Sequence, residues 1–115
     1  MNTLGEAKLL RIFIGEKDRC DGLPLYEYLV RLAREQGLAG ATVLRGIEGY
    51  GAASRLHTAR ILRLSEDLPI VVEIADKEER IAPFVEQLPG IFDRAGCGGM
   101  ATMEKVEVLL LRPGK

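Results

Sequence analysis

Two segments of the chain alternate apolar and other residues with a period of two. The first spans residues 7–14 and the second residues 68–75 (LPIVVEIA). This alternation is typical of β-strands that have one buried face. Pro69 suits the start of the second strand. We therefore expect two half-buried strands, whose helix-facing side chains are Leu10, Ile12, Ile14, Ile70, Val72 and Ile74.

Two other segments repeat apolar residues at spacings of three and four, which predicts amphipathic helices. The first helix is expected between Pro24 and Gly37, and the second after Asp76, which we expect to cap it. Pro83 and Pro89 predict a kink or a break near residues 88–90. The apolar positions of the two helices are Leu25, Leu29, Leu32, Ala33, and then Ile81, Phe84, Val85, Leu88, Ile91 and Phe92.

Residues 41–50 and 103–111 complete the predicted secondary structure as two further strands. Gly46 lies inside the first of these strands and indicates a bulge or a close backbone approach. The resulting order predicts the α+β class, as a ferredoxin-like βαββαβ sandwich. In this fold a four-stranded antiparallel sheet carries two helices on one face. At this length we expect residues 1–115 to form a single domain.

The face of the predicted sheet turned away from the helices mixes apolar and charged residues. Its candidates are Leu9, Arg11, Phe13, Val71, Glu73 and Ala75. Such a face is too apolar to leave in water and too polar for a core, so we expect it to be buried between subunits of a homo-oligomer. Arg11 and Glu73 lie on strands that should be neighbours, where they can pair across the sheet.

The charges of the chain nearly balance, with 16 Lys and Arg against 17 Asp and Glu and a net charge of −1. No overall field therefore draws the protein to nucleic acid or to an anionic membrane, and 29% charged residues argue against membrane insertion. Cys20 and Cys97 lack the paired spacing of zinc or redox motifs, and no secretory signal is recognisable at the N-terminus. A soluble, cytoplasmic protein is expected.

Glycines and basic residues gather between positions 37 and 63. Gly49 and Gly51 flank Tyr50 at the expected strand end, and the following loop contains Arg55, His57, Arg60 and Arg63 before the next acidic residue. Glycines let backbone amides approach a ligand closely, and guanidinium groups suit phosphate and carboxylate. The segment is therefore a candidate anion site or partner-contact loop, with a solvated basic loop as the alternative.

The stretches GLAGATVLRGIEGYG (37–51) and LPIVVEIAD (68–76) resemble the second strand and the return strand of PII signal-transduction proteins. Over nearly the whole length, the chain is similar to the PII-like family known as domain of unknown function 190. This resemblance implies a homotrimer with small-ligand sites between subunits. PII proteins bind adenine nucleotides there, and their T-loop contacts a target protein. Here the 51–65 loop would contact a target, such as a membrane transporter or an enzyme.

Matching positions in the resemblance suggest which residues hold the ligand. Thr42 would lie near a base, and the 96–99 loop would take the phosphate-loop position. That loop lacks the lysine and arginine that hold polyphosphate in PII proteins, which favours AMP, ADP or another anion over ATP. Residues 52–66 contain no tyrosine, so uridylylation is not expected. The expected ligand residues are Thr42, Arg45, Gly49, Gly51, Gly96, Gly98, Gly99 and Lys105, and the partner-contact residues are Arg55, His57, Arg60 and Arg63.

Catalysis and metal binding have no support in the sequence. No Gly-x-Ser-x-Gly, Walker A or His-Glu-x-x-His pattern occurs, and His57 is the single histidine. We therefore expect no catalytic residue and no metal ligand. The sequence implies no firm cofactor, and an adenine nucleotide is the candidate ligand. Because the same fold hosts acylphosphatases and metal-tolerance proteins, two alternatives remain. One is a ligand-independent protein-interaction subunit, and the other is a small metal-binding protein or enzyme.

Overall fold

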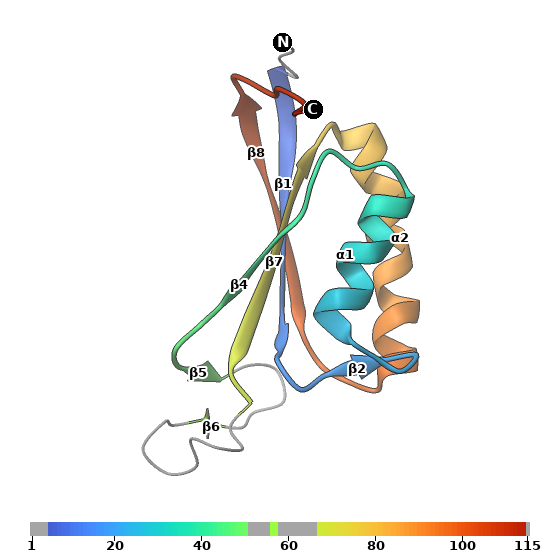
Figure 1. Ribbon diagram of the computed structural model, residues 1–115, viewed down its shortest axis with the longest axis vertical. Coiled ribbons are helices and arrows are strands. Elements are labelled where there is room, and N and C mark those ends of the chain that lie inside the picture. Colours follow the sequence, from blue (N-terminus) through green and yellow to red (C-terminus); the bar gives the residue numbers. More distant parts are fainter. Residues whose placement is uncertain (1–4, 51–55, 58–66, 115) are drawn as a thin grey trace.

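A four-stranded antiparallel sheet with two helices on one face forms the centre of the molecule (Figure 1). The computed structural model describes residues 5–50, 56–57 and 67–114, and only the backbone of residues 56–57. The strand order is β4-β7-β1-β8. This arrangement confirms the predicted α+β ferredoxin-like βαββαβ fold. The elements are β1 (Gly5–Gly15), α1 (Leu25–Glu35), β4 (Thr42–Arg45), β7 (Pro69–Asp76), α2 (Glu78–Ala95) and β8 (Met100–Val108).

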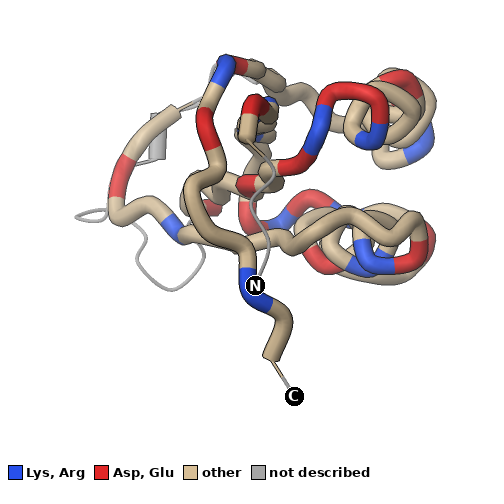
Figure 2. The backbone as a smooth tube through the Cα atoms, turned by 90° about the horizontal axis from the view of Figure 1, so that it is seen from above, with Lys and Arg blue, Asp and Glu red and all other residues tan. Residues whose placement is uncertain are grey.

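Two short hairpins extend this arrangement. One pairs β2 (Arg19–Cys20) with β3 (Leu23–Pro24), just before α1 begins. The other pairs β5 (Gly49–Tyr50) with β6 (Leu56–His57). Viewed from above, α1 and α2 lie side by side on the same side of the sheet, and acidic and basic residues are spread along both helices (Figure 2).

The core lies between the sheet and the two helices, where the sequence pattern places it. The register of β1 and β7 sets Leu10 opposite Ile74, Ile12 opposite Val72 and Ile14 opposite Ile70. All six side chains are buried in one cluster with residues of both helices. Burying apolar surface in this way is the main stabilising term of the fold. The helix residues buried in the cluster are Leu25, Leu29, Ala33, Ile81, Phe84, Leu88 and Ile91.

Helix α2 differs from the expectation at its start and at its prolines. Lys77 is the N-cap residue and no side chain caps the helix, so the predicted cap by Asp76 is wrong. Asp76 instead ends β7 with its carboxylate buried. The helix also runs unbroken through Pro83 and Pro89. Buried residues precede and follow Pro89 on one helix face, so packing against the sheet offsets the hydrogen bond that proline cannot donate.

The predicted strand at residues 41–50 is divided in two by Gly46. The Gly46 amide donates to the carbonyl of Pro69 at 2.7 Å, and a Cβ atom on Gly46 would lie 2.8 Å from Pro69 Cγ. The close backbone approach expected there is confirmed, and β4 ends just before it. The last strand also starts and ends three residues earlier than predicted, because its pairing with β1 runs from Met100, opposite Phe13, to Val108, opposite Gly5.

Strand register arranges the uncovered face of the sheet in rows. One row is apolar and crosses all four strands through Leu44, Val71, Phe13 and Met100. The next row on this face is polar and contains Thr42, Glu73, Arg11 and Thr102. Within it, Arg11 forms the expected cross-strand pair with Glu73 at 2.9 Å and also pairs with Glu104. This face therefore carries both an apolar stripe and a charge network.

Candidate ligand site

A hollow of about 390 Å³ lies on the uncovered face, near the end of the sheet where β1 begins and β8 ends. Its floor is formed by Leu9, Glu73 and Ala75 of β1 and β7. Residues 39–41, which connect α1 to β4, form one wall together with Thr42 at the start of β4, and Val108 and Leu111 contribute the remaining lining. This volume falls in the range of small-molecule sites, which is about 300–1,000 Å³.

The lining of the hollow is small, mostly apolar, and nearly free of charge. Thr42 contributes a hydroxyl group, and Glu73 is the one charged side chain among those lining residues that the structure describes. The Arg11 guanidinium balances that charge, and hydrogen bonds to Glu73 and then Glu104 raise the pKa of Arg11. The hollow can therefore hold a flat, largely apolar group with hydrogen-bond donors. Among its described lining residues there is no cation for a phosphate.

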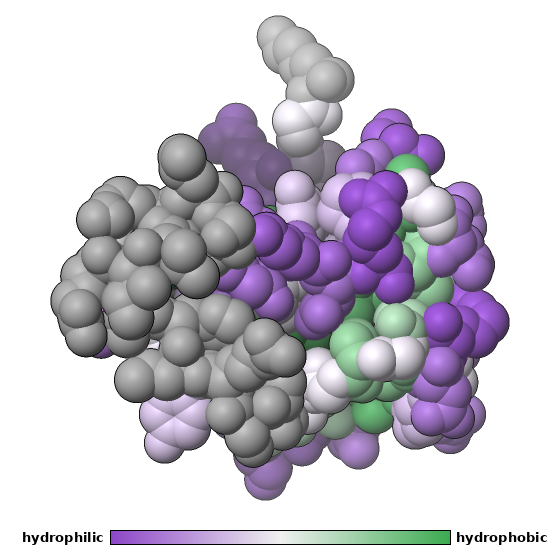
Figure 3. Space-filling view, turned by 90° about the horizontal axis from the view of Figure 1, so that it is seen from below, coloured by the Kyte–Doolittle hydropathy of each residue, from purple (hydrophilic) through white to green (hydrophobic). Residues whose placement is uncertain are grey.

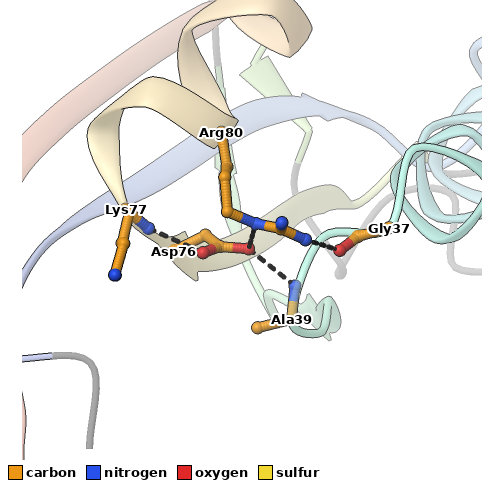
Figure 4. Close-up of polar contacts among 5 residues, drawn as sticks. All are labelled: Gly37, Ala39, Asp76, Lys77 and Arg80. Carbon is orange, nitrogen blue, oxygen red and sulfur yellow. Dashed lines mark hydrogen bonds and ion pairs between the residues drawn. The ribbon is translucent and has the colours of Figure 1, made fainter.

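The wall of the hollow is anchored from behind by the end of β7 and the start of α2. The Ala39 amide donates to Asp76 Oδ2 at 2.9 Å, and Arg80 Nε donates to the same oxygen at 3.1 Å (Figure 4). Arg80 Nη2 also donates to the carbonyl of Gly37. Gly37 has φ +77° and follows the end of α1, where a left-handed residue ends the helix.

Thr42 is the predicted ligand residue that lines this hollow, and Arg45 lies farther along β4. Arg45 Nη1 is 2.9 Å from Glu16 Oε2, so its charge is balanced by the loop after β1. Gly49 pairs with His57 between β5 and β6, and a Cβ atom on Gly49 would lie 3.2 Å from Pro69 Cγ. The other predicted residues of this region, Gly51, Arg55, Arg60 and Arg63, lie outside the described residues.

The predicted phosphate loop follows α2 at the opposite end of the sheet from the hollow (Figure 1). Gly96 ends α2 with φ +66°, and Gly98 follows in the loop. A Cβ atom on Gly99 would lie 2.4 Å from the Phe92 ring and 2.8 Å from the Phe13 carbonyl. Close packing therefore already explains a glycine at position 99. Figure 3 shows this end of the molecule, with apolar surface between polar side chains on the side of the helices.

Lys105 lies on β8 opposite Lys8 of β1. It lines a second hollow of about 390 Å³ together with Glu6, Val106 and Glu107. Within one protomer, the predicted ligand residues on β4 and those near or on β8 thus flank opposite edges of the sheet. Three strand spacings separate these edges by about 14 Å. Within one protomer, a small ligand that contacted both groups would have to span this distance.

Cys97 and Asp18 contact each other beside the phosphate-loop glycines. The Cys97 thiol donates to the Asp18 carboxylate, which also accepts the Gly15 amide at 2.8 Å. Burial first, and then the nearby acidic groups, raise the pKa of the Cys97 thiol to about 11. The thiol is therefore protonated at neutral pH and is a poor nucleophile. This environment favours a structural role for Cys97.

Metal-ligand clusters and membrane-spanning helices are both absent from the described part of the chain. No group of three or more His, Cys, Asp and Glu side chains within residues 5–50 and 67–114 is arranged to hold a metal ion. In the same ranges, neither helix combines the length and the apolar character that a membrane span requires.

Sequence reasoning did not identify several residues of the hollow. Ala39, Val108 and Leu111 are far apart in the chain, and neutral aliphatic residues carry no local signal of binding. Glu73 was predicted as the partner of Arg11, but not as part of a ligand site. Asp76 was predicted to cap a helix, although its carboxylate is directed at the wall of the hollow. The signal in the sequence that could have indicated this role was an acidic residue, Asp76, at the end of an apolar strand.

The sheet order β4-β7-β1-β8 with two helices on one face is the fold of PII-like proteins. The chain belongs to the DUF190 family (Uncharacterized ACR), whose model matches residues 7–108. It is 44% identical over 104 residues to a UPF0166 protein of Aquifex aeolicus (strain VF5), covering 90% of this chain and 94% of the relative.

Two solved structures share the fold at low sequence identity. One is CPII, a nitrogen regulatory PII-like protein from Thiomonas intermedia K12, bound to ADP, AMP and bicarbonate. It has a TM-score of 0.67 and 20% identity, over 90% of this chain and 88% of that chain. The other is a PII-like signaling protein from Thermus thermophilus. It has a TM-score of 0.65 and 22% identity, over 94% of this chain and 93% of that chain.

Proposed function

We propose that this protein is a homotrimeric, cytoplasmic PII-like regulatory protein that binds an adenine nucleotide between its subunits. The observation that carries the proposal is the hollow beside residues 39–42, on a sheet face that the helices leave uncovered. Its small apolar residues and Thr42 suit a nucleobase, which needs a flat surface and a few hydrogen-bonding groups. The adenine nucleotides bound to CPII support the same ligand class.

The charge of the site favours AMP or ADP over ATP. The lining of the hollow, within residues 5–50 and 67–114, includes no Lys or Arg, and residues 95–102 also lack both. Phosphate groups are held by charge-assisted hydrogen bonds, and a triphosphate needs more of them than a monophosphate. We propose that Arg45 of one subunit and the glycine loop of a neighbour supply the contacts to a short phosphate chain.

The exposed apolar residues of the sheet support self-association. Leu44 is 48% exposed and Met100 is 55% exposed, at the two ends of the apolar row. Strands β4 and β8 are edge strands of the four-stranded sheet, and unpaired edges invite pairing with another chain. Burying the uncovered face in a trimer would remove this apolar surface from water and bring a β4 edge next to a β8 edge.

The 51–65 loop is the proposed contact with a target protein, such as a transporter or an enzyme. Strand β5 directly precedes this segment and pairs with β6, which lies within it. Its arginines at positions 55, 60 and 63 suit an acidic partner surface. Ligand binding between subunits would then favour one conformation of the loop over another, because a ligand shifts a protein toward the state that it binds more tightly.

Calorimetric titration of the purified protein with AMP, ADP, ATP and bicarbonate tests the ligand. We expect saturable binding of AMP or ADP, weaker binding of ATP, and loss of affinity in Thr42→Val but not in Thr42→Ser. Absence of binding at millimolar concentrations of all four would contradict the proposal. Pull-downs that lose the same partner when Arg55, Arg60 and Arg63 are changed to Ala, without any effect of ligand, would then favour the ligand-independent interaction subunit.

A further inference from the structure

Asp76 has a buried carboxylate that does not take part in the proposed contacts with the ligand. Its side chain is 2% exposed and accepts hydrogen bonds at both oxygens (Figure 4). Oδ1 accepts the Lys77 amide at 2.7 Å, and Oδ2 accepts the Ala39 amide and Arg80 Nε. A buried carboxylate without such donors is strongly unfavourable. These bonds therefore join the end of β7, the start of α2 and the connection from α1 to β4.

The Asp76–Arg80 pair holds that connection at two backbone atoms. Arg80 donates to the Gly37 carbonyl, and Asp76 accepts the Ala39 amide. Between these residues, Leu38 is 9% exposed and packs in the core. Residues 37–39 are thus fixed where the wall of the hollow begins, and two of the contacts are charge-assisted and therefore strong.

The wall itself has little regular structure of its own. Helix α1 ends at Glu35 and β4 begins at Thr42, so residues 39–41 lie between two elements. A Cβ atom on Gly40 would meet nothing within 4 Å, so side-chain packing does not restrain that position. The position of the wall depends on its anchors, which are β4 on one side and the Asp76–Arg80 pair on the other.

We infer that Asp76 and Arg80 are positioning residues that set nucleotide affinity by holding residues 39–42 in place. Neither residue lines the hollow, so neither touches the proposed ligand directly. The inference rests on the proposed function for its effect on affinity. The effect on the wall is a property of the ligand-free protein and can be measured alone.

Arg80→Ala is the main test variant, because Arg80 is half-exposed on the surface of α2 and its removal leaves the core intact. The matched control is Arg31→Ala, which removes an arginine in an i,i+4 pair with Glu27 on α1. Asp76→Asn provides a second test, because asparagine keeps the size of the side chain and an acceptor oxygen but loses the charge. Arg80→Lys keeps the positive charge but lacks the planar guanidinium that contacts both Asp76 and the Gly37 carbonyl.

Amide hydrogen exchange in the ligand-free protein measures the wall. In Arg80→Ala we expect the Ala39 amide to exchange about tenfold faster or more, since the lost bonds are charge-assisted. The Gly46 amide, which bonds to Pro69, serves as an internal reference and should keep its exchange rate. Unchanged exchange at Ala39 in both Arg80→Ala and Asp76→Asn would overturn the inference.

Calorimetry with AMP and ADP measures the consequence for binding. We expect Kd to rise about tenfold in Arg80→Ala, to recover partly in Arg80→Lys and to stay unchanged in Arg31→Ala. Faster exchange at Ala39 with an unchanged Kd would overturn the effect on affinity. If the wild-type protein binds no nucleotide, the proposed function and the affinity claim both fail, and exchange at Ala39 still decides whether the pair holds the wall.

Discussion

Arg11 and Glu73 lie opposite each other on β1 and β7, and the Arg11 guanidinium is 2.9 Å from the Glu73 carboxylate. Arg11 also pairs with Glu104 of β8. One cation thus links three strands at the centre of the uncovered face. Because Glu73 lines the hollow, this network connects the candidate ligand site with the surface that we propose is buried between subunits.

Arg11→Ala should weaken self-association more than it weakens the isolated fold. Removing the guanidinium leaves Glu73 and Glu104 on the same face without their shared cation, and burial between subunits makes that repulsion costly. The pair is partly exposed in one protomer, so its contribution to the stability of the isolated fold is small. Sedimentation velocity at micromolar concentration should show more dissociated protein than in the wild type. Dissociation equal to that of Arg31→Ala would contradict this prediction.

Gly99→Ala should destabilise the protein by about 1–3 kcal/mol, because the new Cβ atom would overlap the Phe92 ring and the Phe13 carbonyl. Gly90→Ala is the matched control within α2, where a Cβ atom meets nothing within 4 Å. Alanine is the better helix former, so that control should gain up to about 1 kcal/mol. Chemical denaturation without ligand measures both changes. Wild-type stability in Gly99→Ala would show that packing does not require this glycine.

Asp18→Asn should change the pH dependence of stability. Burial is the largest cause that raises the pKa of Asp18, and the nearby Asp67 raises it further. A carboxyl group with a raised pKa binds its proton more tightly in the folded state. Its stabilising effect is therefore present at low pH and is lost as the pH rises through the folded pKa.

The free energy of unfolding of Asp18→Asn, measured from pH 3 to pH 7, should therefore rise relative to the wild type as the pH increases. Asparagine keeps an oxygen that can accept the Gly15 amide, which preserves the local geometry. Asp21→Asn is a suitable control, because Asp21 lies nearby in the turn between β2 and β3 and its side chain is exposed. A difference that moves in favour of the wild type with rising pH would refute the prediction.

The fold could be predicted because two strands have one strictly buried face. In β1 and β7, residues such as Ile12 and Val72 alternate with partly exposed ones, and this pattern specifies both strand and register. Strand β8 is an exposed edge that lacks this alternation of burial, which is why its ends were misplaced by three residues. No break occurs at the prolines of α2, because local propensity does not include the packing on both sides of Pro89.

The candidate site was less predictable, because it depends on contacts between distant segments. Thr42 was expected from the family resemblance, and its position on the hollow is compatible with a ligand role that stays a prediction. An aspartate between a strand and a helix looks the same in sequence whether it caps the helix or anchors another loop. For Asp76 the decision comes from the Ala39 amide, which the topology brings within 2.9 Å.

A structure of the protein crystallised with ADP tests the central claim most directly, because it examines assembly, site and ligand together. We predict a trimer with the adenine base against residues 39–42 and the phosphates between the β4 edge of one subunit and the glycine loop of another. An ADP-free hollow at saturating ligand, or a nucleotide bound within one protomer away from Thr42, would contradict the account.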